Sequence, residues 1–308
     1  MTPAQLSHDP LWPRTGSWPA PGTLPTGANA DLGLIGLPTW RTSLSPTQAH
    51  TTPNAIRAAL RRYGSTTRLR DGRTLALDNL LTIVDAGNVA EPDAPVGETG
   101  AVDAVAALAA RARLVLALGG DNAATVPAVL GTWGADIATA GLITFDAHHD
   151  LRDGVSNGSP VRRLVEAGLD GRRIVQIGIA DFANSVAYTR RAADLGITVI
   201  PRNDLHTRPL SEIITEACDV AGSGGGPIHV DIDVDVCDRS VAPACPASLP
   251  GGLAAHELRT AARLVARDTR VASIDLTEID ATTDTPDGRT VRLAALLVLE
   301  TLAGLAER

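Results

Sequence analysis

Two apolar runs in this chain lead into acidic residues at alternating positions. The side chains in question are Asp146, His148 and Asp150 after the first run, and Asp231, Asp233 and Asp235 in the second. An apolar run of this length predicts a buried strand, and residues two apart on a strand point to one side. Carboxylates packed this closely repel one another and are costly to desolvate unless a cation neutralises them. We therefore predict that the two stretches form the halves of one divalent-metal site.

A plainer interpretation applies to each stretch taken alone. A single Asp-x-Asp at the end of a strand commonly caps the following helix or faces water. The occurrence of two such stretches is what favours a metal site. His229 and His256 stand apart from these patterns, and we expect both to be structural.

Apolar strands and helices alternate along the chain. The expected strands are residues 30–38, 80–87, 114–120, 142–145, 174–179, 197–200, 228–236 and 271–276. The expected helices are residues 54–62, 101–113, 161–167, 185–195, 210–220, 254–267 and 291–305. Near-continuous apolar strands separated by such helices predict an α/β fold with a parallel sheet covered on both faces. Such sheets bind ligands at the carboxyl ends of their strands, where both acidic stretches are expected.

The two ends of the chain differ in composition. Residues 1–30 are rich in Pro, Gly, Ser and Thr, so we expect an irregular N-terminal arm that packs on the body or on a neighbouring subunit. Residues 31–308 show no internal repeat and no domain boundary, which predicts a single domain. The glycine-rich stretch 221–227 precedes a strand and lacks the GxGxxG order, so a flexible loop is expected there rather than a phosphate cradle.

The charge composition excludes several classes of function. The net charge is -8 and the sequence pI is near 5.3, which argues against non-specific binding to nucleic acid or to an anionic membrane. All 27 basic residues are arginine, so Schiff-base chemistry and a P-loop lysine are excluded. Three cysteines without a paired pattern, and the lack of a signal peptide or membrane span, lead us to expect a cytoplasmic protein.

Four motifs follow one another along the chain. They are Gly119-Gly120-Asp121-Asn122, Asp146-Ala147-His148-His149-Asp150, Asn157-Gly158-Ser159-Pro160 and Asp233-Val234-Asp235-Val236-Cys237-Asp238. A match at Asp275-Leu276-Thr277-Glu278 follows near the end of the chain. In order and spacing these motifs resemble those of the ureohydrolase family, which includes arginases, agmatinases and formimidoylglutamases. The resemblance covers residues 30–305.

The resemblance implies a three-layer α/β/α fold, as in arginase, and a pair of manganese ions. The ligand positions that it implies are Asp146, His148, Asp150, Asp233, Asp235 and, in place of a histidine, Asn122. Hard carboxylates with few imidazoles suit Mn²⁺ better than Zn²⁺, which prefers nitrogen and sulfur ligands. Water held between two such ions is acidified enough to attack the carbon of an amidine. Family members are often homo-oligomers, and we expect the same here.

Two departures from the family pattern limit this transfer of roles. Asn122 stands where the family usually has a histidine ligand, and a neutral amide oxygen should hold a transition metal less firmly than imidazole. Two alternatives stay open: Asp231 or Asn122 supports a weak second ion, or the site works with one tightly held ion. Asn157 stands where arginase-like members have a histidine that transfers protons. The lack of this histidine argues against arginase-like proton transfer here.

The remaining roles follow from the same resemblance. Asp150 is expected to accept a proton from the nucleophile and pass it on, and Glu278 is expected to pair with the cationic amidine nitrogens. Asn157 is placed with Glu278 among the catalytic and substrate-binding residues. Arg152 resembles the arginine of the Asp-Ala-His-x-Asp-x-Arg motif in formimidoylglutamases, where a guanidinium could grip a glutamate carboxylate in a bidentate manner.

This pattern predicts hydrolysis of N-formimidoyl-L-glutamate to L-glutamate and formamide, a step of histidine breakdown. Four more arginines are candidates for the substrate site but are expected to be surface or salt-bridge residues: Arg162, Arg163, Arg289 and Arg292. An alternative in the same class releases urea from agmatine or a guanidino acid. An alternative in another class is a non-catalytic family member whose metal site is impaired by Asn122. We expect a small-molecule substrate, and neither a nucleic acid nor a membrane, as the partner.

Overall fold

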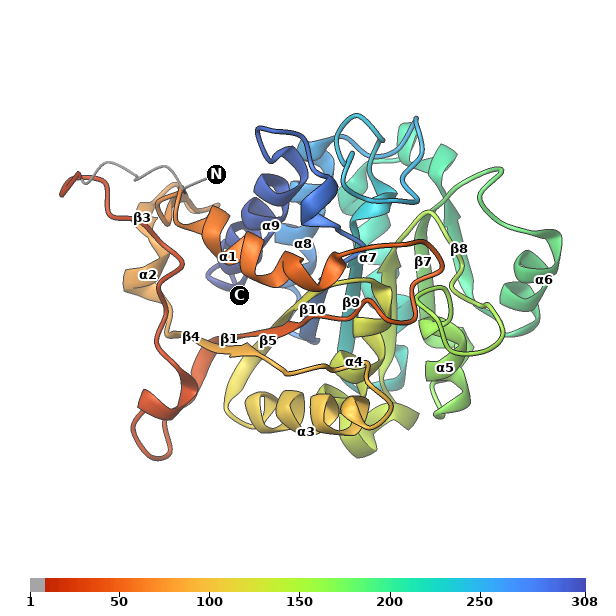
Figure 1. Cartoon of the computed structure of the whole chain (residues 1–308), viewed down its shortest axis with the longest axis horizontal. Coiled ribbons are helices and arrows are strands. Elements are labelled where there is room, and N and C mark those ends of the chain that lie inside the picture. The colour runs from red at the N-terminus through yellow and green to blue at the C-terminus, as the bar shows by residue number, and fades with distance from the viewer. Residues whose placement is uncertain (1–8) are drawn as a thin grey trace.

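Eight parallel strands form the central sheet of the computed structural model, which describes residues 9–308 (Figure 1). In spatial order they are β4 (Ile83–Asn88), β1 (Ala30–Leu37), β5 (Ala112–Gly119), β10 (Val271–Thr277), β9 (Ile228–Asp233), β6 (Gly141–Phe145), β7 (Ile174–Ile179) and β8 (Thr198–Pro201). Strands β9, β6 and β7 are buried along their whole length, as expected for a sheet that is covered on both faces.

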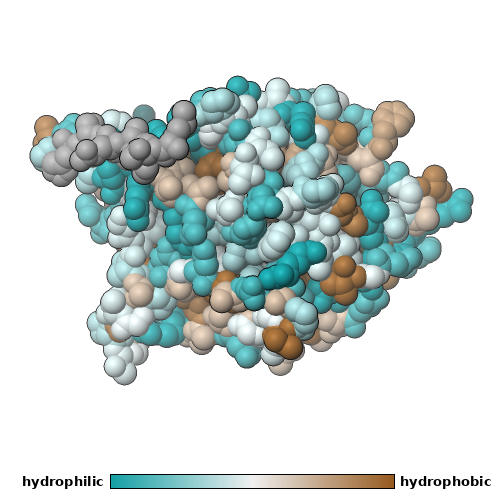
Figure 2. Space-filling model, viewed as in Figure 1, coloured by the Kyte–Doolittle hydropathy of each residue, from teal (hydrophilic) through white to brown (hydrophobic). Residues whose placement is uncertain are grey.

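Helices cover both faces of this sheet (Figure 1). One layer consists of α1 (Thr52–Leu60), α7 (Leu210–Ala221), α8 (Ala255–Arg267) and α9 (Arg289–Leu305). The other contains α3 (Gly97–Ala109), α4 (Thr125–Trp133), α5 (Pro160–Glu166) and α6 (Val186–Asp194). Within residues 9–308, none of the helices is both long enough and apolar enough to cross a membrane. On the face seen in Figure 2, hydrophilic side chains predominate and apolar ones are scattered among them.

The predicted three-layer fold with a central parallel sheet is confirmed, but several boundaries differ from the expected ones. The expected strand at 80–87 begins only at Ile83, because Leu77–Leu80 form a short helix, α2. The expected helix at 101–113 begins earlier, at Gly97, and its last residues belong to β5. Helix α4 and the hairpin of β2 (Thr66–Arg68) and β3 (Thr74–Ala76) also lay outside the expectation.

The strand predicted at 228–236 also ends early, at Asp233. The Asp233 side chain accepts a hydrogen bond from the backbone N–H of Asp235, 2.9 Å away, and residues Val234–Val236 turn into a 3-10 helix. Asp235 therefore leaves the alternation of the strand. The expectation that Asp231, Asp233 and Asp235 lie along one strand was wrong in this respect, because an aspartate at a strand end can cap the turn that follows.

The N-terminal arm lies against the body of its own chain from residue 9 onward. Trp18 Nε1 donates to Asp78 Oδ1 at 2.9 Å, and the backbone of Asp85 donates to Pro19 at 2.9 Å. Apart from a 3-10 turn at Pro21–Thr23, residues 9–29 contain no helix or strand. The expected arm also includes residues 1–8, which lie outside the described residues, and its packing on a neighbouring subunit stays a prediction.

The Gly120 turn joins three strand ends, and we expect Gly120→Ala to lower the free energy of unfolding by about 1–3 kcal/mol. A Cβ at Gly120 would lie 2.0 Å from the backbone oxygen of Thr39, and the Gly120 carbonyl accepts a hydrogen bond from the backbone of Glu278. Urea unfolding measures the effect. Gly100→Ala is the control: Gly100 is exposed on α3 with nothing within 4 Å of its Cβ position, so that variant should be as stable as the wild type or slightly more so.

Candidate active site

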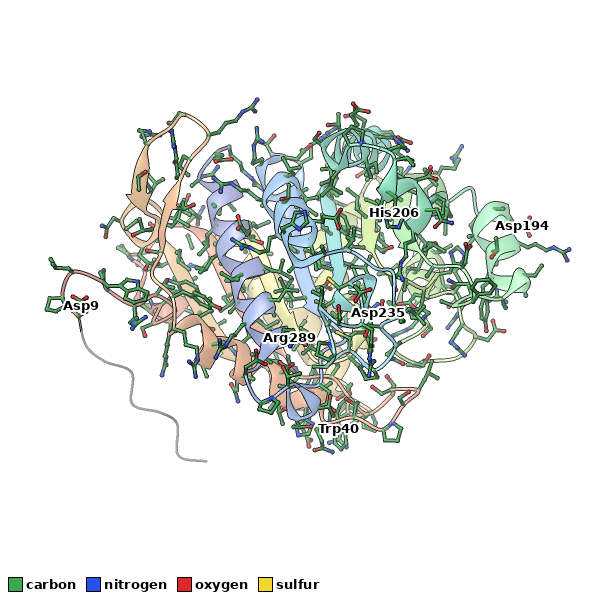
Figure 3. All side chains as sticks on the ribbon, turned by 90° about the horizontal axis from the view of Figure 1, so that it is seen from above. Asp9, Trp40, Asp194, His206, Asp235 and Arg289 are labelled. Carbon is green, nitrogen blue, oxygen red and sulfur yellow. The ribbon has the colours of Figure 1, made fainter. Side chains whose placement is uncertain are left out.

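The candidate site lies at the carboxyl ends of four adjacent central strands: β5, β10, β9 and β6. In a parallel sheet these ends share one edge, so residues that are far apart in sequence meet there. In Figure 3, Asp235 lies toward the same side of the molecule as Trp40, which follows β1, and Arg289, which begins α9. His148 of the first acidic stretch lies 3.0 Å from Asp235 of the second, so the two stretches come together at this edge, as the sequence predicted.

The turn after β6 carries Asp146, His148 and Asp150. Asp146 Oδ1 accepts a hydrogen bond from the backbone N–H of His148 at 2.6 Å, which folds the chain back at the strand end. Asp150 has a φ of 53°, in the left-handed region that residues other than glycine rarely occupy. Such strain persists only where the surroundings enforce it, and it is common at functional sites.

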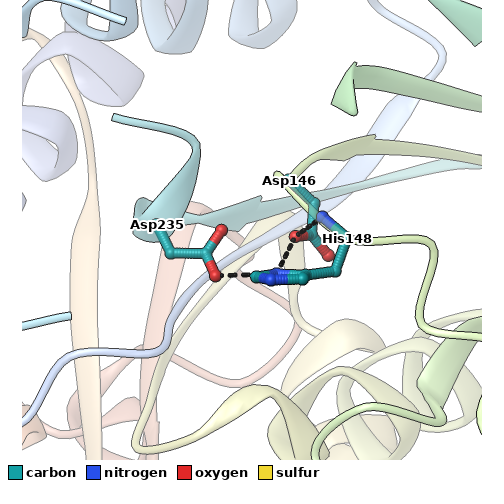
Figure 4. A group of neighbouring side chains, drawn as sticks. All are labelled: Asp146, His148 and Asp235. Carbon is teal, nitrogen blue, oxygen red and sulfur yellow. Dashed lines mark hydrogen bonds and ion pairs between the residues drawn. The ribbon is translucent and has the colours of Figure 1, made fainter. Parts of the chain in front are cut away.

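His148 lies between two buried carboxylates (Figure 4). Its Nδ1 is 3.0 Å from Asp235 Oδ2 and 3.4 Å from Asp146 Oδ1. These three residues offer ligand atoms that all lie within 4.8 Å of one another. Two carboxylates and an imidazole at this separation could hold a divalent cation.

The pKa values of these three groups reflect their burial and their mutual contacts. Burial, and then repulsion by Asp235, raises the pKa of Asp146 to about 6. Burial acts to lower the pKa of His148, but its bonds to Asp146 and Asp235 outweigh burial and raise it to about 12. Burial acts to raise the pKa of Asp235, but its bond to His148 outweighs burial and lowers it. Asp235 and His148 therefore form an ion pair, whereas a negative charge on Asp146 is unfavourable in this buried position.

Three further carboxylates crowd the same region. Asp150, Asp233 and Asp231 are all buried, and burial is the largest cause that raises the pKa of each well above its ordinary value. The next cause is repulsion, by Asp146 on Asp150 and by Asp235 on Asp233. Asp150 and Asp233 line the cavity described below. Such a cluster favours binding of positive charge.

Asn122 begins the turn after β5 and contacts this cluster through its amide nitrogen. Nδ2 donates to Asp150 Oδ2 at 2.6 Å and lies 3.5 Å from Asp231 Oδ2. Its Oδ1 accepts from the hydroxyls of Thr125 at 2.6 Å and Thr277 at 3.0 Å. In this arrangement the carbonyl oxygen, the atom that could bind a metal, is taken by two hydroxyls. Metal binding by Asn122 stays a prediction.

Glu278 and Asn157 are hydrogen-bonded to each other, and both line the cavity described below. Glu278 Oε1 accepts hydrogen bonds from Asn157 Nδ2 at 2.7 Å and from the backbone N–H of Asn122 at 2.8 Å. Burial, followed by repulsion from Asp121, raises the pKa of Glu278 to about 8. Asn157 Oδ1 also accepts from the backbone of Leu44 at 3.0 Å, so Asn157 joins the loop after β1 to Glu278.

A cavity of about 470 Å³ opens over the cluster. His148, Asp150, Asp233, Asp235 and Glu278 line its inner part, and loops after several strands supply the remainder of its wall. Arg152 lines it as well and is the one arginine among the lining residues. The ion pairs found within residues 9–308 do not include one to Arg152, so its positive charge is available to a ligand.

The other four candidate arginines do not line this cavity. Arg162 pairs with Glu166, Arg163 pairs with Glu98 at 2.7 Å, and Arg289 Nη1 donates to the backbone of Ser240 at 2.7 Å. His229 is fully buried, with Nδ1 2.6 Å from Ser273 Oγ and Nε2 3.2 Å from Asp275 Oδ2. The ion pairs of Arg162 and Arg163 agree with the expectation of surface or salt-bridge residues, and the buried contacts of His229 agree with a structural role.

Sequence reasoning missed the wall formed by the segment after β7. Asn184 lines the cavity, accepts a hydrogen bond from the backbone of His149 at 3.0 Å, and donates to the carbonyl of Ala147 at 2.9 Å. It therefore fastens this segment to the turn that carries His148. The signal that could have found it is its place: a polar residue shortly after the carboxyl end of a buried strand.

Comparison with known proteins agrees with this geometry. A family profile described as "Arginase family" matches residues 30–304. The chain belongs to the arginase family. The formimidoylglutamase of Halalkalibacterium halodurans is 34% identical to this arginase-family chain over 287 residues, which span 89% of this chain and 86% of that protein.

Solved structures with the arginase fold give the same picture. The crystal structure of formimidoylglutamase from Bacillus subtilis superposes with a TM-score of 0.87 at 29% sequence identity, covering 99% of this chain and 95% of that one. A formiminoglutamase of Trypanosoma cruzi, solved with Mn²⁺, superposes with a TM-score of 0.81 at 23% identity, covering 91% of this chain and 94% of that one. At this identity the similarity shows a shared fold only. The predicted family and fold are confirmed, as is the prediction of a hydrolase.

Proposed function

We propose that this arginase-family chain is a manganese-dependent formimidoylglutamase. The reaction is N-formimidoyl-L-glutamate plus water to L-glutamate plus formamide. It breaks the bond between the amidine carbon and the glutamate nitrogen, and water supplies the oxygen of formamide. The substrate has a cationic amidine at one end and carboxylates at the other. The cavity offers the matching charges, because acidic groups lie at its inner part and Arg152 lies in its wall.

The donor set at the inner end fits manganese. Asp146, His148 and Asp235 would hold one ion, and Asp150 and Asp233 would help to hold a second, with Asn122 or Asp231 in support. The fit rests on chemistry: raised pKa values at Asp146, Asp150 and Asp233 show carboxylates whose charge is poorly compensated within the described chain. When bound, the ions neutralise these carboxylates and lower the pKa of water at the site.

The chain's own residues orient the substrate and move protons. Glu278 uses Oε1 for Asn157 and Asn122, which leaves Oε2 to accept an N–H of the cationic amidine. Asp150 receives the proton released by the attacking water and delivers it to the departing glutamate nitrogen. Asn157 acts by holding Glu278 and the loop at Leu44 rather than as a proton carrier, because its amide cannot exchange a proton as imidazole does.

The position of Arg152 in the cavity wall is the observation that favours formimidoylglutamate as the substrate. A guanidinium in the cavity wall binds a carboxylate through two parallel hydrogen bonds, and it would repel the cationic tail of agmatine. Formimidoylglutamate presents carboxylates at the required end. The proposed enzyme has a single domain after the N-terminal arm, acts in the cytoplasm on a small molecule, and assembles into a homo-oligomer.

A product assay on Mn²⁺-loaded protein tests this function. We expect formamide from formimidoylglutamate and no urea from agmatine, arginine or guanidinobutyrate. Arg152→Ala should raise the KM for formimidoylglutamate by about 100-fold while manganese content is retained, because a charge-paired carboxylate contact is lost. Arg190→Ala, on the exposed side of α6, is the control and should match the wild type. Urea as the sole product would place the chain among guanidino hydrolases, and protein that holds no manganese would support a non-catalytic role.

A further inference from the structure

We propose that Arg162 and Arg191 are positioning residues that clamp the backbone on either side of Arg152. We further propose that Gly158 provides the floor along which the Arg152 side chain reaches the cavity. Residues 151–154 are called the Arg152 segment below. The proposal rests on the proposed function, since it concerns how the site holds the carboxylate of its substrate.

Arg191 reaches the Arg152 segment from α6. Its Nη1 donates to the carbonyl of Leu151 at 2.6 Å and to Asp153 Oδ1 at 2.8 Å. These two acceptors flank Arg152 directly. The Arg191 guanidinium carbon also lies 5.6 Å from the centre of the Tyr188 ring, and Tyr188 lines the cavity. One side chain therefore joins α6, the cavity wall and both neighbours of Arg152.

Arg162 holds the same segment from α5. Its Nε donates to the carbonyl of Arg152 at 2.6 Å, and its Nη2 donates to the carbonyl of Gly154. The backbone N–H of Arg152 donates in turn to the carbonyl of Gly158 at 3.0 Å. The N–H and the carbonyl of Arg152 are thus both hydrogen-bonded. Among residues 9–308 no ion pair involves the Arg152 guanidinium, so this group is available to bind a ligand.

Gly158 makes room for the Arg152 side chain. A Cβ on Gly158 would lie 2.7 Å from Arg152 Cδ and 3.1 Å from Arg152 Nε, and a longer 3.2 Å from Leu44 Cδ1. Gly158 is buried and its φ is not positive, so the space taken mainly by Arg152, and not backbone strain, favours a glycine here. Any larger residue at this position has to push Arg152 aside, which the end of a flexible side chain can do without unfolding the protein.

The physical benefit of this arrangement is preorganisation. A flexible arginine loses rotamer freedom when it binds an anion, and a held backbone with a fixed floor reduces that loss. The clamp acts on binding of the distant carboxylate and not on the reacting carbon. Weakening it should therefore raise KM and leave kcat unchanged.

The test compares Arg191→Gln, Arg162→Gln and Gly158→Ala, each alone and combined with Arg152→Ala. Each single variant should raise the KM for formimidoylglutamate by about tenfold, with kcat within about twofold, and should add nothing when Arg152 is already alanine. Calorimetric binding of the product L-glutamate should weaken in parallel. The control is Arg190→Gln, since Arg190 is exposed beside Arg191 on the same helix. Gly158→Ala alters no ion pair, so it keeps the test valid if a glutamine variant fails to fold.

Three results would overturn the clamp. KM values equal to that of the control would do so, as would increases that add in full to the effect of Arg152→Ala. A loss of kcat at constant KM would instead indicate damage to the neighbouring Asp150. Absence of formamide from the wild type contradicts the proposed function alone. L-glutamate binding then still tests the clamp, and equal binding by the wild type and the single variants rejects it.

Discussion

Asp146→Asn is expected to lower kcat by about a thousandfold or more, because it removes a carboxylate from the proposed metal site. The same change should raise the stability of the metal-free protein above pH 6. Asp146 is buried beside Asp235, and its raised pKa shows that its charge opposes folding when no cation is bound. A loss of activity combined with a gain of metal-free stability identifies a metal ligand and distinguishes it from a residue that only supports the fold.

Turnover, bound manganese and thermal unfolding with and without chelator measure these effects. Asp194→Asn is the matched control, since Asp194 is an exposed aspartate at the end of α6 and should alter none of the three. A variant that keeps a tenth of the wild-type kcat and a full complement of manganese would show that Asp146 is not a ligand. A metal-free variant less stable than the metal-free wild type would refute the electrostatic argument.

The sequence predicted the architecture well because the apolar strands are long and separated by helices. The edge at which Asp146 and Asp233 meet followed from strand polarity alone, without any knowledge of strand order. Family motifs supplied the remaining residues of the site. The errors arose where local side-chain bonds compete with the regular pattern, as at Asp233, whose carboxylate ends β9 early. Helix α4 was missed because Pro127 and Gly131 interrupt its sequence, although Pro127 lies in the first turn, where proline is tolerated.

Other features of the site depend on side-chain directions that no sequence pattern specifies. The amide of Asn122 points its nitrogen at Asp150, and this follows from the positions of two threonine hydroxyls on separate elements. From the sequence, Arg162 was expected to be a surface or salt-bridge residue and Arg191 was not singled out, yet the two converge from two helices on one segment. Long-range convergence of this kind becomes visible only when the helices are placed on the sheet.

Removing divalent ions from the wild type should lower its unfolding temperature, and the drop should be greater at pH 8 than at pH 5.5. In the metal-free protein the pKa of Asp146 is about 6 and that of Glu278 about 8, whereas both groups titrate near 4 in an unfolded chain. Between pH 4 and 8 the folded state therefore binds more protons, so its stability falls as the pH rises. His148 acts in the same direction: its pKa is raised to about 12, so the stability from its ion pair is lost progressively as the pH rises above its ordinary pKa of about 6.5.

Manganese bound as proposed would take the place of the protons on the buried carboxylates that hold it, so its stabilising effect should grow across the same pH range. At a concentration of 100 times its dissociation constant the ion should add about 2.7 kcal/mol. Thermal unfolding with chelator and then with added Mn²⁺, at steps between pH 5.5 and 8, measures both quantities. In the Asp146→Asn, Glu278→Gln double variant, the stability of the metal-free protein should change less with pH than in the wild type. This result would distinguish the titration of these two groups from that of other residues. A metal-free unfolding temperature that climbs toward pH 8 would contradict the assignment of these buried carboxylates as the cation-binding groups.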